Sequence, residues 1–100
     1  MSEKSWSELV AAHVPELARL SDEDRAFMES DSALPSWAKY LLAVALDAAA
    51  NHPNGCRSYG KRAVEKGATP AQVAETVKML RMFGGRPAMV TGAEALRELP

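Results

Sequence analysis

A cysteine, a tyrosine and a histidine lie close together in the segment HPNGCRSYGKRA, which begins at His52. Each of these residue types can take part in catalysis. A cysteine thiolate is a nucleophile and a redox group, a histidine moves protons near neutral pH, and a tyrosine hydroxyl donates or accepts a hydrogen bond. Cys56, Tyr59 and His52 are therefore the candidate catalytic residues.

Cys56 follows the turn chemistry of His52 to Gly55 and falls near the start of an expected helix, beside Arg57. A helix amino terminus and a neighbouring cation both favour a thiolate, so a reactive thiol is one interpretation. The other is a small buried hydrophobe, which is the commoner fate of a free cysteine. Because the chain has one cysteine, a sulfenic acid formed there would need an external thiol or a second subunit to resolve it.

Tyr59 lies three residues after Cys56, so the two share one face of a helix. A tyrosine with an ordinary pKa near 10 is a poor base at neutral pH unless nearby cations lower that pKa. The alternative for Tyr59 is simple packing, with an apolar ring and a hydroxyl in water. His52 could act as a proton shuttle, or it could be an ordinary solvated turn residue.

Two charged residues are candidates for binding a substrate. Asp47 lies in an otherwise apolar segment, where a charge needs a partner or an exit to water, so it either faces a pocket with Tyr59 or marks an exposed stripe. Arg86 follows Gly84 and Gly85 and could hold an anionic substrate, although cations near a helix carboxyl end are also ordinary dipole partners. The spacing of the histidines and the cysteine matches no zinc site, so we expect no metal and no cofactor.

Apolar residues recur at spacings of three and four throughout the chain, and no segment alternates with period two for long. The pattern predicts an all-α fold, a compact bundle of about six helices. Pro15 should end or kink the first helix, and Ser21 with Asp24 resembles a capping box that starts the second. The expected helices cover about 6–13, 21–30, 35–51, 55–66, 70–83 and 87–96.

Local signals in the second half of the chain are sharper. Gly67 should end the helix before it as its C′ residue, and Thr69 with Gln72 forms a capping box around Pro70. The helix that follows should bury an apolar stripe. Its members are Val73, Val77, Leu80 and Phe83, with Met79 and Met82 as further core residues.

The segment 35–51 is apolar nearly all round, with Leu41 to Leu46 at its centre. Such a helix should be surrounded by other helices or by a second subunit. It is too short for the roughly 20 residues that cross a bilayer, so we expect no membrane association.

The composition indicates one soluble domain over residues 1–100, since 47% of the residues are hydrophobic and 25% are charged. The net charge of −1 disfavours nucleic-acid binding, which normally needs a basic stripe. The amino end does not combine a basic segment, a long apolar run and a cleavage site, and a lone cysteine forms no internal disulfide. These features predict a cytoplasmic protein.

From Pro35 to about Leu96 the chain resembles the carboxymuconolactone decarboxylase and alkylhydroperoxidase D-like family. The resemblance rests on an alanine-rich helix, on the turn Gly67-Ala68-Thr69-Pro70 and on the closure Phe83-Gly84-Gly85-Arg86-Pro87. It implies an all-α bundle that assembles as a dimer, trimer or hexamer through its central helices. Residues 35–97 would be the family-like core and residues 1–34 additional amino-terminal helices.

The peroxidase-like branch of that family uses a Cys-x-x-Cys-x-x-x-His motif, and the decarboxylase branch uses a histidine in a corresponding place. Aligned on Cys56, the chain has Tyr59 in place of the second cysteine and Ala63 in place of the histidine. Aligned on Gly67, it has Tyr59 in place of the histidine. The motif is degenerate in either alignment, so a thiol cycle within one subunit is excluded.

Three functions follow as hypotheses, and whether the protein is an enzyme is left open. The first is a homo-oligomeric protein of this kind without the thiol pair, which binds or acts on a small organic molecule near Tyr59, Cys56 and His52. The second is a single-cysteine peroxidase that uses Cys56. The third is a non-catalytic interaction subunit.

Overall fold

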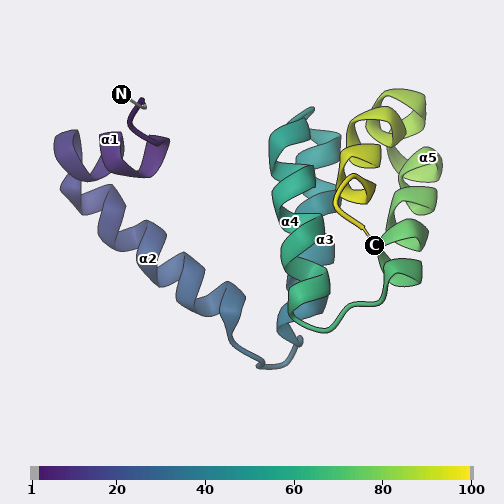
Figure 1. The fold of residues 1–100 in the computed structure, drawn as a ribbon, viewed down its shortest axis with the longest axis horizontal. Coiled ribbons are helices and arrows are strands. Elements are labelled where there is room, and N and C mark those ends of the chain that lie inside the picture. The colour runs from purple at the N-terminus through teal and green to yellow at the C-terminus, as the bar shows by residue number, and fades with distance from the viewer. Residues whose placement is uncertain (1–2, 100) are drawn as a thin grey trace. The chain divides into compact units, whose positions relative to one another are not determined.

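The computed structural model describes residues 3–99, and within that range it contains five α-helices and one short 3-10 helix but no strand (Figure 1). The all-α prediction is confirmed. The count of five α-helices differs from the predicted six, because the expected break at Gly84 and Gly85 does not separate two helices. The chain divides into two units, Met1–Ser30 and Asp31–Pro100.

The first unit holds α1 (Trp6–His13) and α2 (Pro15–Glu29). The predicted helix start at Ser21 is wrong, because α2 begins at Pro15 and runs through Ser21 without a break. Proline suits the first helical position, where its missing N–H would have no partner anyway. Arg19 and Glu23 then form an ion pair one turn apart, 2.9 Å between Nη1 and Oε1, which spans the expected boundary.

The second unit begins with α3 (Ser36–Ala49), as the sequence predicted to within two residues. Its carboxyl end is closed by Asn51 in the left-handed conformation (φ 62°). The His52 N–H donates to the Asp47 carbonyl at 2.8 Å, and the Asn51 N–H donates to the Ala48 carbonyl at 3.1 Å. This pair of bonds is a Schellman motif, and it turns the chain directly into α4.

Helix α4 (Pro53–Glu65) ends in the same way, with Gly67 at φ 115° as the predicted C′ residue. The Gly67 N–H donates to Val64 and the Ala68 N–H donates to Ala63, at 3.0 and 2.9 Å. The predicted capping box follows at once. Gln72 N–H donates to Thr69 Oγ1 at 3.1 Å, and Thr69 N–H donates to Gln72 Oε1 at 2.9 Å.

Helix α5 (Pro70–Gly92) contains the predicted Gly84-Gly85 break as a kink, since Gly85 leaves helical geometry at φ 72° and ψ −172°. The separate final helix predicted for residues 87–96 is therefore divided. Its first part is the end of α5, and its second part belongs to the 3-10 helix η1 (Ala93–Leu96).

Helix α3 packs against α4 and also against α5, while η1 packs against both α4 and α5 (Figure 1). Small residues permit close contact at these junctions. A Cβ atom at Gly60 would lie 2.6 Å from the Ala95 carbonyl oxygen and 2.8 Å from the Ala95 Cα, so only glycine fits here. The buried apolar residues are Tyr40, Val44, Ala48, Cys56, Ala63, Ala68, Val73, Val77, Leu80, Ala88 and Ala95.

We expect Gly60→Ala to destabilise the fold by about 1–3 kcal/mol, because the added methyl group must push η1 away from α4. The better helix propensity of alanine, about 1 kcal/mol, offsets only part of this cost. Urea unfolding followed by circular dichroism measures the change. Ser58→Ala on the exposed side of α4 is the matched control and should leave stability nearly unchanged. Equal stability of the two variants would contradict the close contact.

Candidate functional site

Cys56 is completely buried between α3 and α4, where its Sγ donates a hydrogen bond to the Val44 carbonyl at 3.5 Å. Burial, together with the smaller effect of the nearby Asp47 carboxylate, raises the pKa of the Cys56 thiol to about 11. The hydrogen bond between the Cys56 sulfur and the backbone of the same residue lowers the pKa, but its effect is smaller than that of burial and of Asp47. The surroundings therefore favour the neutral thiol, and of the two interpretations of Cys56 they support the small buried hydrophobe over the reactive thiol.

Tyr59 is half-buried, and its ring stacks on Tyr40 of α3 with 5.8 Å between ring centroids and 28° between ring planes. Tyr40 is 1% exposed and belongs to the core. A stacked aromatic pair of this geometry is a packing contact that holds α4 against α3. Of the two interpretations of Tyr59, this contact favours packing.

Asp47 and His52 lie beside each other at the junction of α3 and α4, with 3.7 Å between Asp47 Oδ1 and His52 Nδ1. The Asp47 carboxylate covers the first turn of α4, since a Cβ atom at Gly55 would overlap it. An anion at a helix amino terminus is stabilised by the helix dipole. Asp47 and Cys56 are thus brought together with His52, but the contacts of Asp47 are those of a residue that joins two helices.

Arg86 is exposed and lies next to Gly85 in the kink of α5. It is separated in the sequence from the other four predicted site residues, which lie on α3, on α4 or in the turn between them. None of the five lines the groove between α3 and α5.

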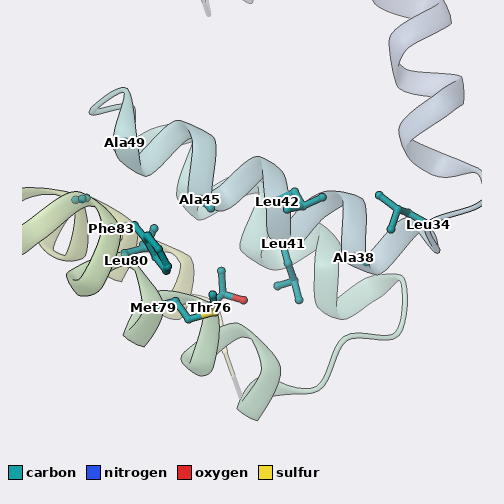
Figure 2. Close-up of a pocket in the computed structure, with 12 residues that line it drawn as sticks. Leu34, Ala38, Leu41, Leu42, Ala45, Ala49, Thr76, Met79, Leu80 and Phe83 are labelled. Atoms are coloured by element: carbon teal, nitrogen blue, oxygen red, sulfur yellow. The ribbon is translucent and has the colours of Figure 1, made fainter.

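That groove has a volume of about 550 Å³, and the helices α3 and α5 form its two sides (Figure 2). Figure 2 shows Leu41 of α3 and Thr76 of α5 pointing into the space between the helices. The lining is Leu34, Ala38, Leu41, Leu42, Ala45, Ala49, Thr76, Met79, Leu80, Phe83, Gly84 and Ala88. The lining combines small residues, whose short side chains leave the volume open, with large apolar side chains, which form its walls.

Thr76 is the one side chain of this lining that can form a hydrogen bond of ordinary strength. Its Oγ1 donates to the Gln72 carbonyl at 2.9 Å, so the hydroxyl can offer a ligand only an acceptor. No residue of the lining titrates near neutral pH. The groove is therefore suited to hold a molecule and has no acid or base of its own to transform it.

The apolar surface continues past the groove. We call Leu42 and Leu46 of α3 together with Met79, Met82 and Phe83 of α5 the apolar face. Leu46 is 71% exposed, Met82 77% and Phe83 80%. Leu46 follows Leu42 by four residues and Met82 follows Met79 by three, so each lies beside a lining residue on its helix. Phe83, Met79 and Met82 were expected to be core residues, but they lie outside the core of the unit that begins at Asp31, because no other helix of that unit buries these side chains.

The sequence analysis missed the groove although it noted both of its walls. The signals were the all-round apolarity of 35–51 and the apolar stripe that includes Leu80 and Phe83. Both indicate helices with more apolar surface than one neighbour covers. Neither signal indicates which side of each helix remains exposed.

A second, smaller hollow of about 280 Å³ lies along α4 and is polar. Its lining is Asn54, Arg57, Ser58, Lys61 and Glu98. Arg57 pairs with Glu98 there, 2.6 Å from Nη2 to Oε1, and the hydrogen bond from Arg57 lowers the pKa of Glu98. The pair neutralises much of the local charge, so the hollow is not a strongly basic anion site.

Residues 31–99 therefore form a unit of helices and turns with a buried thiol and an apolar groove. No family model, no curated protein and no solved structure matches the chain. Within residues 3–99, no three side chains of His, Cys, Asp or Glu gather in a way that could hold a metal ion. In the same range, no helix is both long and apolar enough to cross a membrane.

The burial of Cys56 predicts a distinctive pH dependence. Unfolding returns the thiol to an ordinary pKa of 9.0, whereas in the folded protein it stays protonated up to about 11. Stability from this group is fully present below pH 9 and is lost as the pH rises through 11. Over that interval the unfolding free energy of the wild type should fall by about 2 kcal/mol more than that of Cys56→Ala, which has no thiol.

Urea unfolding at intervals from pH 8 to pH 11 measures both curves. The variant should be less stable at pH 8, because it leaves a small cavity, and the two curves should converge at higher pH. Curves that stay parallel throughout would show that Cys56 is not desolvated.

Proposed function

We propose that this protein binds a small, uncharged, apolar organic molecule in the groove between α3 and α5. The observation that supports the proposal is the groove itself, about 550 Å³ in volume and lined almost entirely by apolar side chains. Small-molecule sites typically have volumes of about 300–1,000 Å³ and apolar linings with few polar groups. The groove falls within that range in both respects.

The chemistry of the lining selects the ligand class. No charged side chain lines the groove, so a charged ligand would lose its hydration without gaining a partner. An apolar ligand gains about 25 cal/mol for each Å² of surface that it buries. A single hydrogen-bond donor on the ligand could reach Thr76, which has only an acceptor to offer.

We further propose that the protein is a carboxymuconolactone decarboxylase-like homo-oligomer that lacks the redox thiol pair. The support is the order of local features in the sequence, from the Gly67 helix end and the Thr69 capping box to the kink at Gly85. The proposal concerns architecture and not chemistry, because Cys56 and Tyr59 are engaged in helix packing.

The alternative of a single-cysteine peroxidase has less support. A pKa of about 11 for Cys56 leaves on the order of one thiol in ten thousand ionised at pH 7. The thiolate is the nucleophile, and here peroxide would also have to reach a fully buried sulfur atom. The third hypothesis, an interaction subunit, is favoured by the exposed Leu46 and Met82, which no ligand inside the groove would cover.

We expect the neutral fluorescent probe N-phenyl-1-naphthylamine to bind the full chain. Ala45→Phe should weaken this binding about tenfold or more, because the loss of apolar contacts worth about 1.4 kcal/mol lowers an affinity tenfold. Ala45 lines the groove from α3, so a phenyl ring added there occupies ligand space. Fluorescence titration measures the affinity.

Ala74→Phe is the matched control, because it adds the same ring at an exposed position of α5 outside the lining. It should bind the probe as the wild type does. Unchanged binding by Ala45→Phe, together with loss of binding on Tyr59→Ala, would move the site to α4 and contradict the proposal.

A further inference from the structure

We propose that the groove is one half of a ligand site, and that a second copy of this chain closes it through the same apolar face. This inference rests on the proposed function, since the ligand in question is the apolar molecule in the groove. It adds that the binding site is composite and that ligand binding and dimerisation are coupled.

The first argument is the position of the exposed side chains. Leu46 and Met82 are 71% and 77% exposed and lie outside the groove lining, so a ligand that fills the groove leaves them in water. Phe83 lines the groove and is 80% exposed, so it belongs both to the groove and to the apolar surface beside it. Contiguous exposed apolar side chains of this kind mark interaction surfaces.

The second argument is the amount of surface. The five side chains of the apolar face are between 51% and 80% exposed. Together they leave on the order of 500 Å² of apolar area open on each copy, if each side chain presents roughly 150 Å², the lower bound for an aromatic ring. Two copies face to face would bury about 1,000 Å² through these side chains alone, the lower limit for a specific interface.

A dimer at that lower limit is weak without further contacts. A ligand between the copies would touch both of them and add buried apolar area to each. Binding to the paired form in preference to the single one stabilises the pair by mass action. Ligand and second copy should therefore each strengthen the binding of the other by the same factor.

The third argument is that the face is complementary to itself. Large side chains such as Phe83 and Leu42 stand beside small residues such as Ala45 and Ala49 (Figure 2). Under a twofold axis the same patch meets itself, so the projecting side chains of one copy can enter the hollow of the other.

The centre of the apolar face carries no charge. The five side chains of the apolar face and the groove lining contain no charged group, so two identical faces bring no like charges together at their centre. Lys78 is two residues from both Thr76 and Leu80 and so lies away from the groove, but it precedes Met82 by four residues and therefore flanks the edge of the apolar face.

Sedimentation velocity of the full chain, with and without N-phenyl-1-naphthylamine, tests the proposal. The monomer mass is 10.8 kDa. We expect a concentration-dependent species of twice that mass, and a dimer dissociation constant that falls about tenfold or more when the probe is added, because the probe contributes contacts worth at least 1.4 kcal/mol.

Leu46→Glu and Met82→Glu are the decisive variants, one on each helix and both outside the lining. Each should be monomeric and should also bind the probe about tenfold less tightly, because the second half of the site is lost. Leu20→Glu makes the same substitution at an exposed leucine of α2 and should keep both the dimer and the affinity. Circular dichroism verifies that all three variants are folded.

The outcomes separate the two proposals. Monomeric Leu46→Glu and Met82→Glu that bind the probe as tightly as the wild type would overturn the composite site but leave the groove as a binding site. A wild type that is monomeric with and without bound probe would do the same. A wild type that dimerises but does not bind the probe would overturn the proposed function and the composite site with it.

Discussion

The fold of residues 31–100 depends on how the apolar surface of α3 is shared among its neighbours. Tyr40, Val44 and Ala48 are buried in the core, and α4 and α5 both pack against the helix. These contacts bury only part of the apolar surface of α3. Leu42 and Leu46 stay exposed, and the groove opens beside them. An apolar helix that the other helices of its unit cover incompletely favours any occupant that removes the rest of its apolar surface from water.

The same interface explains why the chemically capable residues are not arranged as a reaction centre. Cys56 donates to a carbonyl of α3, Tyr59 stacks on an α3 ring, and Asp47 covers the start of α4. Each of these groups satisfies a requirement of helix packing. Desolvation then makes the cysteine a weaker acid, the opposite of what nucleophilic chemistry requires. Binding without covalent chemistry is the function most consistent with these contacts.

Features encoded within a few residues could be predicted from the sequence, and features decided by tertiary packing could not. The Gly67 helix end and the Thr69 capping box depend only on neighbouring residues, and both are confirmed. Ser21 carried a similar local signal, but the helix that starts at Pro15 overrides it. The stripe on α5 correctly marked Val73, Val77 and Leu80 as buried, whereas Phe83 at its edge is exposed because no other helix of the same unit covers that side.

We propose that ligand binding occurs between α3 and α5 and not beside the cysteine and tyrosine of α4. Two-dimensional amide NMR of the full chain, recorded during titration with a neutral apolar probe, distinguishes the two places. We expect the largest shift changes on groove residues such as Ala38, Ala45 and Gly84, while Cys56 and Tyr59 change little. Changes centred on Cys56, Tyr59 and His52, with the groove residues unaffected, would contradict it.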